Sequence, residues 1–163
     1  MSQESEKKNL FQPQGRVKVI QGSILTPHDA GLRFVLNVNN LVGKAESPLY
    51  PIFDKKWPRV KSEAKGWYNN RTGAYKLGAV NTTAVQSDTW VVHLLCQDAE
   101  LTTSADGLKA CLKEVCKMAK SERASVHVST LLTDVVPELT ELLQKELVEQ
   151  GISVSFYEEP KAQ

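Results

Sequence analysis

The chain has 163 residues, a length that suits one compact domain with a sizeable core. Its 20 lysine and arginine residues and 19 acidic residues give a formal charge of +1, which argues against bulk electrostatic binding to nucleic acid or to an anionic membrane. No apolar run approaches the roughly 20 residues of a membrane-spanning helix. Residues 1–8 are polar and lack the apolar centre of a signal peptide, so we expect an intracellular protein, nuclear or cytoplasmic.

The three cysteines indicate free thiols in a reducing compartment, because their number is odd and no signal peptide precedes them. They do not form the closely spaced ligand pairs of a zinc site, so we expect no metal and no cofactor. Polar residues at both ends predict a disordered tail at 1–14 and a second tail at 160–163. Between them we expect a single domain at 15–159.

The first half of the chain predicts two strands followed by two short helices. Residues 16–20 alternate between apolar and polar side chains, and residues 32–38 are almost continuously apolar, as in a strand covered on both faces. Three prolines interrupt the next segment. Because proline is tolerated in a first helical turn, we expect short helices at 49–56 and at 58–66.

Residues 76–85 and 89–96 predict a β-hairpin, since two apolar runs flank a short polar turn. Ser104 then precedes an amphipathic helix with one apolar stripe, which predicts a buried helix face. The stripe consists of Leu108, Cys111, Leu112, Val115 and Ala119.

The last third of the chain is the most informative segment, because it predicts a β-α-β unit. A strand at 125–128 is followed by a loop at 129–134, by an amphipathic helix that Gly151 ends, and by a second strand at 152–157. Strands in such a unit lie parallel, and ligands bind beyond their carboxyl ends. The loop at 129–134 is therefore a candidate ligand-binding segment. With the alternation of helices and strands from Pro48 onward, this predicts an α/β domain with three layers, α/β/α, and a mixed central sheet.

The chain carries no phosphate-binding Walker loop, no nucleophile elbow and no His-Glu-x-x-His helix. His93 and His127 lie inside apolar strands, which predicts buried histidines. His28 is interpreted as a solvated loop residue, although Asp29 beside it could orient it as a base.

Asparagine is a poor strand former, yet Asn37, Asn39 and Asn40 lie at the carboxyl end of a strand that should be central. Two interpretations remain open for them: capping of loop backbone, or contact with a ligand.

The order of these segments resembles the macro domain family, in particular the macro domains of chromatin-remodelling helicases and small ADP-ribose-binding proteins. The likeness covers roughly Val17 to Glu158. The matching segments are 19–24 (VIQGSI, similar to an opening strand with a Gly-Asp-Ile turn), 35–40 (VLNVNN, similar to the strand with an Asn-Ala-Ala-Asn signature), 76–80 with 90–97 (the central hairpin), and 124–128 with 152–157 (the closing β-α-β unit).

The resemblance implies a macro-domain-like fold and an ADP-ribose site, because macro domains bind ADP-ribose and some remove it from proteins or nucleic acids. The family aspartate that holds the adenine amino group corresponds to Ser23, which is uncharged. The two loops that wrap the phosphates correspond to 45–48 and 129–134, which lack glycine and carry Glu46 and Asp134. Losing two or three charge-assisted bonds, each worth about 1.5–3 kcal/mol, lowers affinity by several orders of magnitude.

When the family's functional positions are transferred to the matching residues of this sequence, the resemblance implies a set of ligand-binding residues and one catalytic candidate, Asn40. The ligand-binding set is Ser23, Ile24, Asn37, Asn40, Ser47, Ser129, Thr130, Leu131 and Tyr157.

We therefore expect an interaction module with altered or lost ADP-ribose binding, which acts through protein or nucleic-acid contacts. The alternative is a reader of ADP-ribose or a related nucleotide. An ADP-ribosyl hydrolase or deacylase is the least favoured hypothesis, because no paired acid and base stands in the loops. A nucleic-acid partner is not favoured, since the main basic run is typical of a solvated helix face, and we expect no membrane partner. The basic run consists of Lys55, Lys56, Arg59, Lys61 and Lys65.

Overall fold

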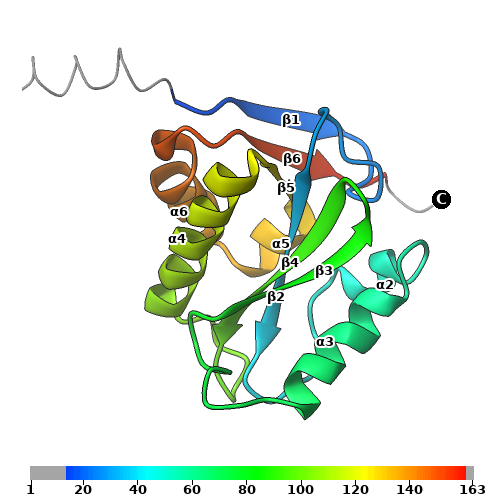
Figure 1. Cartoon of the computed structure of the whole chain (residues 1–163), viewed down its shortest axis with the longest axis vertical. Coiled ribbons are helices and arrows are strands. Elements are labelled where there is room, and N and C mark those ends of the chain that lie inside the picture. The colour runs from blue at the N-terminus through cyan, green and yellow to red at the C-terminus, as the bar shows by residue number, and fades with distance from the viewer. Residues whose placement is uncertain (1–13, 161–163) are drawn as a thin grey trace, which may run out of the picture.

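The computed structural model describes residues 14–160 and shows a six-stranded mixed sheet in the order β1-β6-β5-β2-β4-β3 (Figure 1). All neighbouring strands pair in parallel except β3, which lies antiparallel to β4 at one edge. The strands are β1 (Val17–Gln21), β2 (Arg33–Asn40), β3 (Val80–Gln86), β4 (Thr89–Gln97), β5 (Ser125–Ser129) and β6 (Val154–Glu158).

Helices cover both faces of this sheet, which confirms the predicted three layers. In Figure 1, α4 and α6 lie on one side of the sheet and α2 and α3 on the other. The helices are α2 (Tyr50–Phe53), α3 (Arg59–Asn69), α4 (Ala105–Glu122), α5 (Thr130–Val135), α6 (Leu139–Glu146) and the 3₁₀ turn η1 (Val148–Gln150).

Strand β2 is the centre of the sheet, with β5 on one side and β4 on the other. Every residue from Phe34 to Asn40 is buried, as expected for a strand covered on both faces. The strand continues two residues beyond the predicted end at Val38, because the polar side chains that follow find hydrogen-bond partners inside the protein.

Helix α4 forms as its sequence predicts. The Ser104 side chain accepts a hydrogen bond from the Gly107 N–H at 3.0 Å, which caps the helix. All five residues of the predicted apolar stripe are buried against the sheet and α6. The Cys111 thiol belongs to this core, and burial raises its pKa to about 12, so it is an inert hydrophobe.

Two predicted segments differ from the structure. In the segment 129–134, predicted as a loop, residues 130–134 belong to helix α5, because no glycine or proline interrupts them and Leu132 is buried. Ser129 is the last residue of β5 and caps the helix. Residues 76–79, predicted as strand, lie outside β3, because Gly78 takes a left-handed backbone with φ of 99°.

The β-α-β prediction is confirmed, since β5 and β6 pair in parallel. The amphipathic helix α6 ends at Glu146, before the predicted stop, and Gly151 with φ of 94° instead ends the 3₁₀ turn η1. The predicted tails at 1–14 and 160–163 fall almost wholly outside the described residues. Across residues 14–160, none of the helices combines the length and the apolar character needed to cross a bilayer.

Candidate functional site

The carboxyl ends of the parallel strands meet at one edge of the sheet, and the predicted ligand-binding residues gather along it. From one end to the other the edge carries three groups of these residues. They are Ser23 and Ile24 with Tyr157 (β1 and β6), Ser129 to Leu131 (β5), and Asn37, Asn40 and Ser47 (β2 and its loop).

The first group holds a carboxylate from the same chain. The Ser23 hydroxyl donates a hydrogen bond to one oxygen of Glu159 at 3.1 Å, and the Ile24 N–H donates to the other oxygen at 2.9 Å. The Ser23 oxygen accepts from the Leu25 N–H at 3.1 Å, which fixes the turn. We call Ser23, Ile24 and Glu159 the Ser23 corner.

Sequence reasoning missed Glu159. Its position follows from pairing, because β1 and β6 lie parallel and their carboxyl ends must meet: Gln21 is in register with Glu158, and the Gly22 N–H donates to the Glu158 carbonyl. The parallel pairing of the first and last strands was the signal that could have located it.

Tyr157 lies beneath this corner and is completely buried. Its hydroxyl accepts from the His28 N–H at 2.8 Å and lies 2.8 Å from Nδ1 of His127. Burial raises the pKa of Tyr157, so the hydroxyl stays neutral. The Tyr157 side chain therefore connects the core to the loop that contains His28, and in this structure it is not accessible to a ligand.

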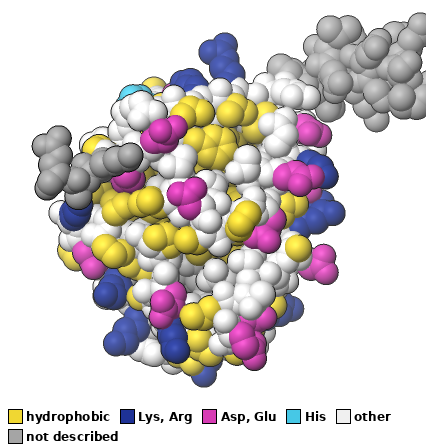
Figure 2. All heavy atoms as spheres, turned by 180° about the vertical axis from the view of Figure 1, so that it is seen from behind, with side chains coloured by type: hydrophobic (Ala, Val, Ile, Leu, Met, Phe, Trp, Pro, Cys, Tyr) yellow, Lys and Arg dark blue, Asp and Glu magenta, His cyan; other side chains and the backbone are white. Residues whose placement is uncertain are grey.

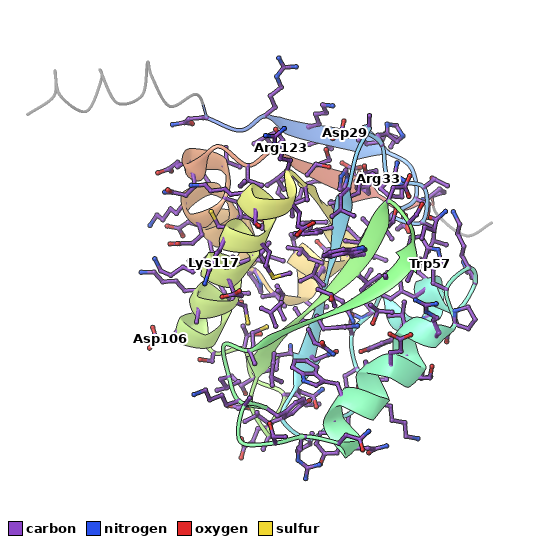
Figure 3. All side chains as sticks on the ribbon, viewed as in Figure 1. Asp29, Arg33, Trp57, Asp106, Lys117 and Arg123 are labelled. Carbon is purple, nitrogen blue, oxygen red and sulfur yellow. The ribbon has the colours of Figure 1, made fainter. Side chains whose placement is uncertain are left out.

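His28 is exposed, as predicted, and Asp29 does not orient it. Asp29 forms a salt bridge with Lys18 at 2.9 Å, and this hydrogen bond lowers the pKa of the Asp29 carboxyl. Asp29 and Arg33 lie at the same end of β2 (Figure 3), where the Arg33 guanidinium donates to the carbonyls of Pro27 and Asp29. This segment serves to anchor the loop between β1 and β2.

Asn37 is completely buried in a chain of hydrogen bonds that runs through the sheet. Its oxygen accepts from the Ser47 hydroxyl at 2.5 Å, and its amide nitrogen lies 3.3 Å from Nδ1 of His93. Nε2 of His93 lies 3.2 Å from the Thr83 hydroxyl. The Asn37 amide nitrogen can only donate, so Nδ1 accepts and Nε2 carries the proton. Both polar atoms of Asn37 are thus engaged within the protein.

Asn40 closes the loop that follows β2. Its oxygen accepts from the N–H groups of Val42 and Lys44 at 3.2 and 3.0 Å, and its amide nitrogen donates to the Lys44 carbonyl at 2.9 Å. Of the two interpretations that the sequence left open, the structure shows backbone capping at this position. The catalytic assignment of Asn40 stays a prediction.

Ser129 and Thr130 are also engaged inside the fold. The buried Ser129 hydroxyl accepts from the Leu131 N–H at 3.2 Å as the cap of α5, and the Thr130 hydroxyl donates to the Tyr157 carbonyl at 3.3 Å. Glu46 and Asp134 are exposed on the two segments that correspond to the phosphate loops. Figure 2 shows the molecule from behind, with acidic side chains scattered among hydrophobic ones.

Gly43 gives the loop after β2 its shape, since its φ is 69° and its N–H donates to the Asn40 carbonyl. A Cβ at this position would overlap the Tyr68 ring. We expect Gly43→Ala to lower the free energy of unfolding by about 1–2 kcal/mol from the left-handed backbone alone, and further from the overlap. Denaturant unfolding followed by circular dichroism measures the change.

Gly73→Ala is the matched control for that substitution, because nothing lies within 4 Å of a Cβ built at Gly73. Equal unfolding free energies for the two variants would show that the loop tolerates a side chain at position 43.

The described residues contain no group of three histidine, cysteine or acidic side chains that could hold a metal ion. Burial raises the pKa of the Cys96 thiol, and this residue lies in the core.

No protein-family model matches the chain, and no curated protein matches it. Solved structures do. A macrodomain protein from Streptomyces coelicolor shares 21% identity over 89% of this chain and 100% of its own, with a TM-score of 0.80. A protein of unknown function from Bacteroides thetaiotaomicron shares 22% identity over 88% of this chain and 98% of its own, with a TM-score of 0.78. DarTG from Thermosipho africanus, solved in complex with ADP-ribose, shares 14% identity over 91% of this chain and 43% of its own, with a TM-score of 0.67.

These similarities define the class of protein by its fold: the chain has the macrodomain fold. The resemblance stated from the sequence is thereby confirmed at the level of architecture.

Proposed function

We propose that this chain is a macrodomain-type interaction module in which ADP-ribose binding is altered or lost, and which acts through contacts with a protein or a nucleic acid. The observation that carries the proposal is the Ser23 corner. There, the hydroxyl and the N–H that would face an adenine ring already bind the carboxylate of Glu159.

The carboxylate competes with a nucleotide because it occupies both donors of the corner, the Ser23 hydroxyl and the Ile24 N–H. An adenine must displace Glu159 before it can accept a hydrogen bond from the Ile24 N–H.

The other predicted contacts support the same conclusion. Asn37, Asn40 and Ser129 each use their polar side-chain atoms for internal hydrogen bonds. A ligand that recruits them must first break those bonds, and each buried group left unpaired costs about 1–3 kcal/mol.

A reader of ADP-ribose is the second candidate function. It is supported by the fold and by DarTG, whose structure contains ADP-ribose. It also draws support from the Ile24 N–H, which becomes free whenever Glu159 leaves. Hydrolysis of an ADP-ribosyl bond ranks below both candidates, since Asn40, the residue that the resemblance points to, is committed to closing its loop.

Calorimetric titration with ADP-ribose tests the proposal. We expect the wild-type chain to bind more weakly than about 1 mM, or not at all. We expect Glu159→Ala to strengthen any binding by roughly tenfold or more, because the variant frees the Ser23 hydroxyl and the Ile24 N–H; tenfold corresponds to about 1.4 kcal/mol.

Glu158→Ala is the matched control, because Glu158 is the neighbouring acid, is exposed, and contributes only its backbone carbonyl to the corner. Submillimolar binding by the wild type that Glu159→Ala leaves unchanged would overturn the proposal. If Ser23→Val then abolished that binding, the reader function would replace it.

A further inference from the structure

A small cavity lies beside the loop after β2, on the side that faces α3. Its volume is about 180 Å³. The loop, the end of β2 and helices α2 and α3 form its walls. The lining residues that matter here are Lys44, Lys61, Lys65, Asn40, Tyr50 and Tyr75.

Three lysines and no acidic residue line this cavity. Lys61 and Lys65 are four positions apart on α3 and therefore lie on one face of the helix, and Lys44 of the loop lines the same cavity. None of the three forms a salt bridge within the part of the chain that the structure describes, although Arg59 on the same helix pairs with Glu63 at 3.0 Å. Like charges gathered around one cavity repel, and a bound anion removes that repulsion.

The remaining polar groups of the wall are neutral and already oriented. The Tyr50 hydroxyl donates to the Asn39 side-chain oxygen at 2.6 Å, and the Tyr75 hydroxyl donates to the Asn40 carbonyl at 2.8 Å. Burial raises the pKa of Tyr50 to about 12 and also raises that of Tyr75, so neither adds negative charge. The Tyr75 ring packs edge-on against Trp67, with ring centroids 4.8 Å apart, which holds this wall in place.

We propose that this cavity binds a phosphate group carried by a small phosphorylated ligand. Three ammonium groups more than balance the charge of about −2 on a phosphate monoester at neutral pH, and lysine binds phosphate as a point charge. The volume is well below the roughly 300–1,000 Å³ of pockets that enclose a whole small molecule. The cavity therefore holds the phosphate, and the remainder of the ligand stays outside. This site is separate from the Ser23 corner, so it stands whether or not the chain binds ADP-ribose.

Titrations with inorganic phosphate, with AMP and with adenosine test the proposal, followed by the backbone amide signals of a ¹⁵N-labelled sample. We expect phosphate and AMP to shift the signals of Gly43, Lys44 and Ala64, and adenosine to leave them unchanged. We expect the double variant Lys61→Gln and Lys65→Gln to bind phosphate and AMP with an affinity roughly tenfold lower, or lower still. Binding by the wild type should weaken strongly at 1 M salt, where the screening length is about 3 Å.

The control is Lys109→Gln combined with Lys117→Gln. Both lysines are exposed on α4, where Figure 3 labels Lys117, and α4 lies on the other face of the sheet. Equal affinities for the two double variants would overturn the proposal, as would anion-dependent shifts confined to residues 129–135.

Binding of AMP but not phosphate would show that the base, and not the phosphate, is recognised. Binding of a single-stranded oligonucleotide alone would indicate a surface contact with nucleic acid instead. The variants separate the two sites: a change in affinity with Lys61→Gln and Lys65→Gln reports on this cavity, whereas a change with Glu159→Ala reports on the Ser23 corner.

Discussion

Lowering the pH from 7 to 5 is expected to reduce the free energy of unfolding by roughly 4 kcal/mol, because two histidines are buried in their neutral form. Burial lowers the pKa of His93 to about 4, and burial likewise lowers the pKa of His127 to about 4. In the unfolded chain both titrate near the ordinary value of about 6.5. The unfolded state therefore binds more protons between these values, and the stabilisation present above pH 6.5 is lost as the pH falls toward 4.

The hydrogen bonds of His93 explain why the folded state resists its protonation. A protonated ring presents N–H groups on both sides, but on one side it faces the amide nitrogen of Asn37, which is also a donor. The Asn37 amide cannot rotate to offer its oxygen without losing the bond from Ser47. The whole chain of bonds must break to admit the charge.

Denaturant unfolding at pH 7, 6, 5 and 4 measures this dependence, with each histidine contributing about 2 kcal/mol between pH 7 and pH 5. The control is His28→Gln, which removes the exposed histidine and should leave the slope unchanged. A flat profile between pH 7 and 5 would contradict the burial of neutral imidazoles.

Asn37→Ala is expected to lower the free energy of unfolding by about 2–6 kcal/mol, because it leaves two buried groups each without one partner, at about 1–3 kcal/mol per group. The Ser47 hydroxyl loses its acceptor and Nδ1 of His93 loses its donor. Because Ser47 belongs to the loop after β2, the loss also loosens that loop. Thermal and denaturant unfolding give the magnitude.

A double-mutant cycle with Ser47→Ala shows whether the two side chains act together. We expect the double variant to be clearly more stable than the sum of the single losses implies, since removing both partners leaves fewer unpaired groups. Asn81→Ala, in the less buried strand β3, is the control and should cost far less. Strictly additive losses of unfolding free energy for Asn37→Ala and Ser47→Ala would contradict the coupling of the two side chains.

Much of the architecture could be predicted because it depends on short-range patterns. The apolar run of β2, the capped stripe of α4 and the β-α-β unit with its stop at Gly151 each follow from local periodicity and turn chemistry. The same kind of reasoning failed at α5, because the residues after the strand at 125–128 were interpreted as the loop of the β-α-β unit, while the Ser129 cap and the buried Leu132 favour a helix.

The site was harder to predict, because its contacts join residues that are far apart in the sequence. The asparagines at the end of β2 were singled out from the sequence, but their partners at Ser47, His93 and Lys44 depend on tertiary packing. The basic run was interpreted as a solvated helix face. Only the folded loop shows that Lys61 and Lys65 share a cavity with Lys44.

The pairing of β1 with β6 has a consequence for how the molecule assembles. Ser23 and Glu159 are 136 residues apart, and β1 pairs with no strand other than β6 in the described sheet. During synthesis β1 stays unpaired until β6 has been made. Pairing between strands so far apart in the sequence is slow. The Ser23 corner is therefore completed only after β6 and Glu159 have emerged, and any truncation that removes β6 leaves β1 unpaired in the described sheet.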